Sequence, residues 1–583
     1  MVSETRLVTD FLLRAEETAT LGIRFVELTG EDRFFSYQEV IGRAKTAAAA
    51  YQEAGLRPGD RVALVLATSI EFFDALLGAQ LAGGIPTALY PPFRLGKLDE
   101  YYARLRRMLG KVGTRFLVTD SRIGRILGPG VEHVPSLERV IHAPELQRGG
   151  GVWRPVAADP DSPAFLQFSS GTTVEPKAVM VSHENLVCNL EMMKAALGAY
   201  TEEDQARGAV SWLPLYHDMG LVGCLYMGLY FPGNVTYLRP DLFLAKPAVW
   251  LQAISRRRAV ISAAPNFAYG LCLKKVTDAE MEGVDLSSWR MALNGAEPIE
   301  LRTAEQFAER FGRWGFPRTA MTPVYGLAEA GLGVSFSEVD QPPHTVEFDR
   351  EALSLEDRAV PGEGRRMVSV GRPLPGLKVA IQDESGAALP EGRVGRIMVR
   401  GPSITRGYFQ DPGLTATIIR NGWLDTGDLG FLHDGHLYIS GRLKDLIIIR
   451  GRNYAPQEVE ELLLDVPGLR TGCAVALSTM VEEEGEQLIV LGERDTIHPR
   501  PDEEVTAEIN GRVLKGLSLK PHHVELLPPG TLPRTSSGKL RRSDALKQFL
   551  AGELVPPEKV TALKLLKDLG RSQLSWARFR LKR

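Results

Sequence analysis

The sequence predicts an α/β protein with mainly parallel sheets covered by helices, followed by a small α+β domain. The chain has 583 residues, several times the roughly 100–200 residues of an ordinary domain. Strand-like and helix-like segments alternate from early in the chain, which is typical of βαβ units and parallel sheets. Near Gly441 this alternation gives way to a polar stretch, a β-branched strand and a helix entered through Pro456. The change predicts a second unit.

The alternation can be followed segment by segment. RVALVLA at 61–67 is typical of a buried strand, and IEFFDALLGAQLAGG at 70–84 has helical apolar spacing and ends in a glycine pair. Further strands are expected near Phe116 and at 164–168, 209–214 and 259–265. Helices expected between them include 246–257 and 302–313.

Two features fix the domain organisation. Residues 338–366 are polar and poor in large apolar side chains, so this stretch cannot bury much surface by itself and is expected to be a surface insertion. We place the domain boundary at 440–444. This gives an N-terminal domain of residues 1–440 and a C-terminal domain of residues 441–583, long enough for a small α+β fold.

Composition excludes several classes of function. Lys and Arg total 69 and Asp and Glu total 72, so charge gives no reason to propose a nucleic-acid partner. Cys188, Cys224, Cys272 and Cys473 are widely spaced, which argues against zinc and favours a reducing, cytoplasmic location. The N-terminus lacks the pattern of a signal peptide. The apolar run at 219–231 is shorter than the roughly 20 residues that cross a bilayer, so we expect a buried helix and no transmembrane segment.

A hydroxyl- and glycine-rich segment, SSGTTVEPK, follows the predicted strand AFLQF. Such a turn offers backbone N–H and side-chain O–H groups to phosphate oxygens, and Lys177 adds a positive charge. On its own the segment is more often an ordinary turn. Five further segments change that balance: NGAEP from Asn294, VYGLAE from Val324, WLDTGD from Trp423, SGRLKD from Ser440 and PRTSSGKL from Pro533. These motifs, in this order and at these intervals, are not expected by chance.

With these motifs the sequence resembles the adenylate-forming ligase superfamily, which includes acyl-CoA synthetases, nonribosomal adenylation domains and firefly luciferase. The resemblance covers roughly residues 10–550. It implies a large N-terminal domain of several subdomains, with mainly parallel sheets and helices, and a small mobile C-terminal lid domain. The lid of this family rotates between two half-reactions. ATP and Mg²⁺ are the implied cofactors.

The resemblance also assigns roles to individual residues. The phosphate loop is matched by Ser169, Ser170, Gly171, Thr172, Thr173 and Lys177. The adenine side is matched by Asn294, Gly295, Ala296, Glu297, Tyr325 and Gly326, with Tyr325 as the aromatic that stacks on adenine. Glu329 matches the Mg²⁺ carboxylate. Asp428 and Arg442 match the residues that hold the ribose, and Lys444 matches the hinge of the lid.

Lys539 matches the catalytic lysine of the adenylating state. Attack of a carboxylate on the α-phosphate builds negative charge, which an ammonium group and Mg²⁺ can offset. An isolated Gly-Lys pair is usually a solvated turn, but within PRTSSGKLRR we interpret Lys539 as catalytic. The resemblance departs at Val174 and Ala178, where the family usually has glycine in the first case and often in the second. We interpret both as divergence rather than inactivation.

Two segments narrow the substrate to a fatty acid. LPLYHDMGLVG from Leu213 and SAAPNFAYGL from Ser262 are similar to the signatures of fatty acyl-AMP ligases. In that resemblance His217 has a catalytic place at the entry to the site, beside Asp218. Asp218, Asn266, Phe267 and Tyr269 border the acyl side. Apolar walls suit an alkyl chain because each buried CH₂ contributes about 0.8 kcal/mol. The alternative for the two aromatic residues is ordinary core.

The insertion at 338–366 matches the segment that marks fatty acyl-AMP ligases, where it is thought to hinder the lid movement needed for CoA. The resemblance implies transfer of the acyl group to the phosphopantetheine thiol of an acyl carrier protein, for polyketide or lipopeptide biosynthesis. Two alternatives stay open: a medium- or long-chain acyl-CoA ligase, and a catalytically weak acyl-adenylate- or nucleotide-binding module. The basic tail after Leu550 is expected to be a solvated helix with a frayed end, although contact with a carrier protein or membrane is a second reading.

Overall fold

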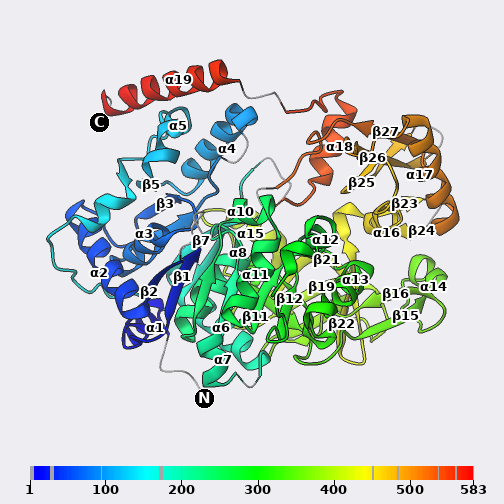
Figure 1. Cartoon of the computed structure of the whole chain (residues 1–583), viewed down its shortest axis with the longest axis horizontal. Coiled ribbons are helices and arrows are strands. Elements are labelled where there is room, and N and C mark those ends of the chain that lie inside the picture. Colours follow the sequence, from blue (N-terminus) through cyan, green and yellow to red (C-terminus); the bar gives the residue numbers. More distant parts are fainter. Residues whose placement is uncertain are drawn as a thin grey trace.

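The computed structural model describes residues 6–26, 32–92, 95–169, 175–198, 200–449, 452–481, 485–535, 538–557 and 561–581. Figure 1 shows a large N-terminal body, made of the described residues up to 442, and a smaller C-terminal unit of residues 447–550 beside it. The terminal helix α19 (Ala562–Leu581) returns to the N-terminal body. The predicted α/β class is confirmed.

The largest sheet has nine strands in the order β17-β14-β13-β12-β11-β9-β10-β1-β2. The run from β13 to β1 is parallel, and the strands at both edges are antiparallel. The strands are β1 (Gly22–Val26), β2 (Asp32–Ser36), β9 (Ala209–Ser211), β10 (Val235–Tyr237), β11 (Ile261–Ala264), β12 (Met291–Asn294), β13 (Met321–Gly326), β14 (Gly333–Phe336) and β17 (Arg372–Pro373). The carboxyl ends of the parallel strands share one edge, where ligands of such sheets bind.

A second sheet is wholly parallel, in the order β4-β3-β5-β6. Successive residues of its strands pack on opposite faces: Val62 and Leu64 on α2 and α3, Ala63 and Val65 on α4 and α5. Both faces are therefore covered, as parallel sheets require. The elements are β3 (Arg61–Val65), β4 (Ile85–Ala88), β5 (Phe116–Thr119), β6 (Arg139–His142), α2 (Tyr37–Glu53), α3 (Ile70–Leu81), α4 (Leu98–Lys111) and α5 (Ser121–Val131).

The helices expected at 246–257 and 302–313 are confirmed as α11 (Ala248–Arg257) and α13 (Leu301–Phe311). The apolar run at 219–231 is a largely buried, continuous helical segment made of α8 (Asp218–Gly220), a π-helical stretch (Leu221–Tyr226) and α9 (Met227–Tyr230). Among the helices that the structure describes, none combines the length and apolar character needed to cross a membrane.

A third sheet departs from the predicted parallel pattern. Strands β18 (Lys378–Gln382), β19 (Gly395–Arg400), β20 (Ile419–Arg420), β21 (Trp423–His433) and β22 (His436–Arg442) pair only antiparallel. For the last two strands the physical reason is the turn that joins them. Asp434 and Gly435 both have positive φ, 52° and 73°, which is the backbone of a two-residue hairpin.

The C-terminal unit has its own core, in two apolar clusters that contain no residue before Ile447 in the part of the chain described. It consists of β23 (Ile447–Ile449), β24 (Arg452–Tyr454), α16 (Pro456–Glu461), β25 (Leu469–Val481), β26 (Gly485–Arg494), α17 (Asp502–Leu517), β27 (His523–Leu527) and α18 (Arg542–Leu550). This independent core supports the boundary that we propose at residues 440–444.

The polar insertion forms an ordered hairpin, made of β15 (Thr345–Asp349), α14 (Arg350–Leu355) and β16 (Gly364–Val368). We call it the insertion hairpin. Phe348 is fully buried, with its ring centroid 5.0 Å from that of Phe431 and 5.4 Å from that of Tyr438 on β21 and β22. Phe348, together with Met367 in the same apolar cluster, thus anchors a largely polar segment to the N-terminal body.

Helix α19 contradicts the expectation that the tail after Leu550 is a solvated helix, while the end expected to be frayed, residues 582 and 583, lies outside the described residues. Helix α19 lies along α5, where Oγ of Ser572 accepts the N–H of Gly128 at 3.0 Å. Trp576 donates its indole N–H to the carbonyl of Gly124 at 2.8 Å. A Cβ on Gly128 would lie 2.3 Å from the carbonyl oxygen of Ser572, so only glycine permits this close crossing. The sequence grouped α19 with the C-terminal domain, whereas its contacts are with the N-terminal body.

A buried histidine makes the stability of the N-terminal body sensitive to acid. His183 begins α6 (His183–Ala196) and accepts the N–H of Val8 from α1 (Val8–Glu16) on its Nδ1 at 3.2 Å. Burial lowers the pKa of His183 to about 4, although Asp10 and Asp159 oppose the shift. Since unfolded histidine titrates near 6.5, the unfolded chain binds the extra proton between these values. We therefore expect the free energy of unfolding to fall by about 3 kcal/mol as the pH drops from 7 to 4.

Urea unfolding at a series of pH values measures this loss for the wild type and for His183→Asn. The variant should show a shallower decline of the unfolding midpoint between pH 6.5 and 4. His498→Asn is the matched control, because the side chain of His498 is 79% exposed. An equal decline in wild type and His183→Asn would contradict the assignment.

Candidate active site

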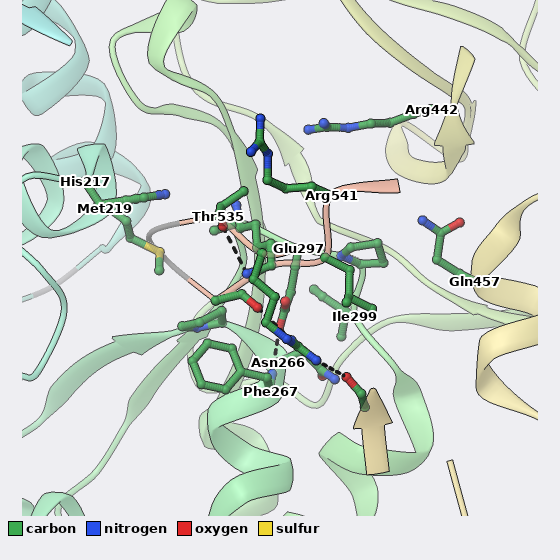
Figure 2. A pocket seen from close by; sticks show the side chains of 18 of the residues that line it. His217, Met219, Asn266, Phe267, Glu297, Ile299, Arg442, Gln457, Thr535 and Arg541 are labelled. Carbon is green, nitrogen blue, oxygen red and sulfur yellow. Dashed lines mark hydrogen bonds between the residues drawn. The ribbon is translucent and has the colours of Figure 1, made fainter. Parts of the chain in front are cut away.

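A cleft of about 2220 Å³ lies between the N-terminal body and the C-terminal unit. Side chains from both parts line it, and Figure 2 shows Thr535 and Arg541 of the later segment next to His217 and Glu297 of the body. The cleft brings together most of the residues that the sequence singled out: Ser169, Lys177, His217, Asp218, Asn266, Phe267, Ala296, Glu297, Tyr325, Gly326, Glu329, Asp428, Arg442, Lys444 and Lys539.

Tyr325, Asp428 and Arg442 form one linked group. The hydroxyl of Tyr325, at the end of β13, donates to Oδ2 of Asp428 at 2.6 Å. Arg442 holds the other oxygen of the carboxylate, with Nε 3.2 Å from Oδ1. Asp428 and Arg442 face each other because they are paired across strands β21 and β22. Burial raises the pKa of Asp428, and Arg442 opposes that rise. The group offers oxygen acceptors and a cation within reach of a sugar.

Gly326 follows Tyr325 and is required by the backbone. A Cβ at this position would lie 1.8 Å from the carbonyl oxygen of Leu332, so the β13–β14 crossing admits no side chain here. Ala296, on the neighbouring strand end, has φ +69°, a left-handed conformation that costs a non-glycine residue about 1 kcal/mol or more. Such strain is typical of backbone shaped for a ligand.

Glu329 lies in a second group with Tyr408 and Lys177. The hydroxyl of Tyr408 donates to Oε1 of Glu329 at 2.8 Å, and Nζ of Lys177 lies 5.6 Å from the centroid of the Tyr408 ring. Burial raises the pKa of Glu329, and Asp218 adds to the rise. Tyr408 and Lys177 oppose it by stabilising the carboxylate. A buried carboxylate beside a cation suits the binding of a hard cation and phosphate oxygens.

His217 and Asp218 are paired at the start of α8, with Nδ1 of the imidazole 2.6 Å from Oδ1 of the carboxylate. Burial by itself raises the pKa of Asp218, but the charges of His217 and Lys539 together with hydrogen bonds lower it to about 2. Asp218 therefore stays ionised and directs His217. On the other side of the cleft, Oε1 of Glu297 accepts the N–H of Phe267 at 2.5 Å, which caps the first turn of α12 (Asn266–Lys275).

Lys539 comes from the C-terminal unit and lies in the cleft among acidic groups of the body. The charges of Asp218, Glu297 and Asp428 act on it and partly offset the lowering of its pKa by burial. Its position is fixed by a tight turn: Thr535 accepts the N–H of Lys539 on Oγ1 at 3.0 Å and donates its own N–H to the Lys539 carbonyl at 2.7 Å. An ammonium group thus enters a cleft that also holds Lys177 and Arg442.

The cleft also has an apolar wall, made of aromatic and aliphatic side chains. Trp212 stacks on Phe243 with ring centroids 3.9 Å apart, and Phe267 meets Trp212 edge-on at 5.9 Å. Leu213, Met219 and Leu271 continue the lining. This wall is suited to an alkyl or aromatic group, whose burial gains roughly 25 cal/mol per Å².

Three predicted residues do not line the cleft. Tyr269 is fully buried among Trp250 and Phe307, so the prediction that it borders the acyl side is wrong and the ordinary-core alternative holds. Asn294 is also fully buried and donates its amide to Asn266 at 3.3 Å. Gly295 lies against Val324, where a Cβ would meet Cγ2 at 2.7 Å. These two positions support the cleft from behind, because Asn294 ends the buried strand β12 and Gly295 follows it.

The predicted phosphate loop is only partly described. Ser169 and Lys177 close a turn between β7 (Pro163–Phe168) and β8 (Ala178–Ser182), with the N–H of Ser169 donating to the Lys177 carbonyl at 3.1 Å. Ser170, Gly171, Thr172 and Thr173 lie outside the described residues, as does Val174. Ala178 is a buried residue of β8, a place where alanine introduces no conflict.

The sequence did not predict two residues of the cleft, Tyr408 and Arg541. Tyr408, which bonds Glu329, stands in RGYFQDP, a segment without charge pattern or periodicity. Arg541 lines the cleft next to Arg104 and Glu100 of α4. The signal for Arg541 was present in PRTSSGKLRR, where arginines stand two and three positions after the predicted catalytic lysine.

The arrangement can place a nucleotide and an acid side by side. Tyr325, Asp428 and Arg442 surround one end of the cleft, while Lys177, Glu329 and Lys539 supply charges suited to phosphates. The apolar wall accepts a hydrocarbon group. The geometry is therefore that of a site where a carboxylate meets a nucleoside triphosphate.

Comparisons with known proteins agree with this geometry. Residues 15–409 match the model of the AMP-binding enzyme family. The chain is 35% identical to a medium-chain-fatty-acid–[acyl-carrier-protein] ligase, JamA, of Moorena producens, over 89% of this chain and 90% of that protein. It is 32% identical to a long-chain-fatty-acid–AMP ligase of Mycobacterium marinum, covering 92% of this chain and 95% of the relative.

The fold has solved counterparts as well. A structure from studies of the fatty acyl-adenylate ligases of E. coli and L. pneumophila superposes with a TM-score of 0.86 and 34% sequence identity, covering 94% of this chain and 98% of that one. The similarity therefore extends through both the N-terminal body and the C-terminal unit. The chain belongs to the AMP-binding, adenylate-forming enzymes, and within them it is a member of the group that contains these fatty acid–AMP ligases.

Proposed function

We propose that the protein uses ATP to convert a fatty acid into fatty acyl-AMP, and then transfers the acyl group to the phosphopantetheine thiol of an acyl carrier protein. In the first step a carboxylate oxygen attacks the α-phosphorus and pyrophosphate leaves. In the second step the thiolate attacks the acyl carbonyl and AMP leaves. The observation that supports the proposal most directly is the entry of Lys539 from the C-terminal unit into a cleft with the acidic groups Asp218, Glu297 and Asp428 of the N-terminal body.

Each cleft residue takes a role in this proposal. Tyr325 stacks on adenine, and Asp428 and Arg442 hold the ribose hydroxyls. Ser169 and Lys177, with the remainder of the predicted loop, hold the β- and γ-phosphates. His217 and Asp218 orient the carboxylate at the entry to the apolar wall, which Asn266 and Phe267 border. Lys539 neutralises the charge that develops at the α-phosphate. Lys444 is the hinge residue.

Glu329 fits the role of Mg²⁺ ligand, because magnesium in such sites is held by one or two carboxylates together with substrate phosphates. Its buried carboxylate is hydrogen-bonded by Tyr408 and lies near Lys177. The ion would offset phosphate charge when bound. Among the described residues there is no group of three or more acidic, histidine or cysteine side chains that could hold a metal ion.

The insertion hairpin supports a carrier protein rather than CoA as acceptor. It is anchored to the N-terminal body by Phe348, and it also bonds to the C-terminal unit. Arg350 donates to the carbonyl of Gly516 at 2.5 Å, and Arg365 pairs with Glu458 at 3.1 Å. These contacts oppose rotation of the C-terminal unit. The relatives named as a fatty-acid–[acyl-carrier-protein] ligase and a fatty-acid–AMP ligase also support a carrier protein as acceptor.

The four cysteines are free thiols, which supports a reducing, cytoplasmic location for this chemistry. A carrier-linked acyl product suits polyketide or lipopeptide biosynthesis. The competing functions are an acyl-CoA ligase and a binding module without turnover. A binding module without turnover is disfavoured because one cleft contains all the residues expected to be needed for turnover: Lys539, Glu329, Asp428 and Arg442.

Incubation with ATP, Mg²⁺ and a series of saturated fatty acids tests the proposal. Mass spectrometry should detect acyl-AMP, and a holo-carrier protein should gain the acyl mass while free CoA does not. Formation of acyl-CoA at a rate equal to carrier loading would favour the acyl-CoA ligase. If the protein binds nucleotide but forms acyl-AMP from none of the acids, the result would favour the binding module.

A further inference from the structure

Helices α4, α5 and α19 form a face with a strong positive charge. Figure 1 shows α19 lying over α4 and α5 at the far end of the N-terminal body. Their acidic residues are Asp99, Glu100 and Asp568, and their cationic residues are Arg104, Arg106, Arg107, Lys111, Arg122, Arg125, Lys564, Lys567, Arg571, Arg578 and Arg580. We call these helices the basic face. The whole chain has a formal charge of −3, so this concentration of positive charge is local.

The basic face is a built surface and not a trailing tail. Ser572, Ser575 and Phe579 are buried between α19 and the helices beneath it. Arg571 pairs with Asp99 at 2.5 Å and Arg578 approaches Glu132 at 3.5 Å. These contacts fix α19 in one orientation, so the side chains on its opposite side are presented at defined positions.

A groove of about 480 Å³ runs between α19 and the helices below it. Its lining includes Arg106, His133, Lys567, Arg571 and Arg578. One carboxylate, Glu132, also lines it and is engaged by Ser575 and Arg578. Beside these groups Leu566 and Leu574 are 66% and 63% exposed, and they lie eight residues, or about two helical turns, apart on α19. Exposed leucines flanked by cations form a surface for an amphipathic acidic partner.

Helix α4 connects the basic face to the cleft. Arg104 of α4 lines the cleft together with Glu100 and Tyr101, whereas Arg106 of the same helix lines the groove. Arg541 of the C-terminal unit approaches Arg104 at the cleft. A partner seated on the basic face therefore lies next to the opening through which a flexible thiol arm would reach an acyl-adenylate.

We propose that the basic face is the docking surface for the acyl carrier protein, an acidic partner whose helix pairs with Lys567 and neighbouring cations and covers Leu566 and Leu574. The inference rests on the proposed function, because it assigns a surface to the acceptor of the second step. Positive charge at the rim steers an acidic partner to the cleft and raises the association rate. The leucines give the contact an apolar centre.

The double variant Lys567→Glu, Leu574→Ser tests the proposal. Both residues line the groove, and neither makes a contact described for the docking of α19 on α5. With an acidic holo-carrier protein as probe, the KM for the carrier should rise about fivefold or more. The rates of pyrophosphate release and of acyl transfer to free pantetheine, which has no protein surface, should not change. Added salt should raise the KM of the wild type more than that of the variant.

The matched control is Lys515→Glu, Leu514→Ser on α17, where the leucine is 54% exposed and the lysine follows it on an exposed part of the helix. This control should leave the KM for the carrier unchanged. Equal effects of the two double variants, or no effect of the first, would overturn the inference. So would loss of binding to phosphatidylglycerol vesicles in the first variant with an unchanged KM for the carrier.

The same measurements separate this inference from the proposed function. If the wild-type protein makes acyl-AMP but does not load a carrier protein, both the proposed acceptor and the proposed docking surface are ruled out. If the wild type loads the carrier protein and the KM for the carrier is unchanged in Lys567→Glu, Leu574→Ser, only the proposed docking surface is ruled out.

Discussion

Replacing Lys539 by alanine should lower ATP–pyrophosphate exchange about 10³-fold while binding of the fatty acid stays unchanged. The ammonium group is placed in the cleft by the Thr535 turn and lies among the acidic groups Asp218, Glu297 and Asp428. A preorganised charge aimed at a developing negative charge contributes about 10²–10³ in rate for one neutral donor, and a full positive charge at the α-phosphate should reach at least the upper part of that range. The apolar wall that holds the acid lies on other residues, so the acid should bind as before.

Lys547→Ala is the control, because Lys547 is an exposed lysine on α18 of the same C-terminal unit. It should leave the exchange rate within about twofold of the wild type, since surface substitutions away from special contacts have small effects. Calorimetric titration of the fatty acid into both variants checks that the acid site is intact. Exchange at the wild-type rate in Lys539→Ala would mean that the charge of the α-phosphate is neutralised by other groups.

The fold was largely predictable because strong local signals fix it. The run RVALVLA and the helix that follows became β3 and α3, since continuous apolar residues must be covered on both faces. The five-stranded antiparallel sheet was missed because the Asp434-Gly435 turn between β21 and β22 was not recognised as a hairpin. Helix α19 was assigned to solvent because its contact with α5 depends on Gly124 and Gly128, more than 440 positions earlier in the chain. One sequence does not reveal which distant glycines meet which helix.

The candidate site was predictable where function requires a fixed motif. Tyr325, Glu329, Asp428, Arg442 and Lys539 were all found from segment order, and all line one cleft. Tyr269 was misplaced because an aromatic residue on a helix has the same pattern whether it faces a ligand or the core. Tyr408 was missed because its role comes from a long-range hydrogen bond to Glu329. Sequence motifs identify chemistry that is local in the chain, whereas the supporting groups are brought in by tertiary structure.

We expect the choice between CoA and a carrier protein as acceptor to depend on the burial of Phe348 in the insertion hairpin. Phe348 is fully buried against Phe431 and Tyr438. Removing such a side chain costs about 3–5 kcal/mol, and here the loss falls on the attachment of the hairpin to the N-terminal body. The hairpin in turn bonds the C-terminal unit through Arg350 and Arg365. Phe348→Ala should therefore free the C-terminal unit to rotate and let CoA act as acceptor.

We expect Phe348→Ala to raise the ratio of acyl-CoA to acyl-carrier product at least about tenfold, because a contact weakened by 1.4 kcal/mol already changes an equilibrium tenfold. Chromatography of the products formed with equal amounts of CoA and holo-carrier protein measures the ratio. Leu355→Ala is the control in the same hairpin, since Leu355 is 47% exposed. Arg350→Ala combined with Arg365→Ala should act in the same direction, because it removes two of the bonds to the C-terminal unit and spares the aromatic anchor. If both variants still exclude CoA while forming acyl-AMP normally, the hairpin does not select the acceptor, and the selection must reside in the cleft itself.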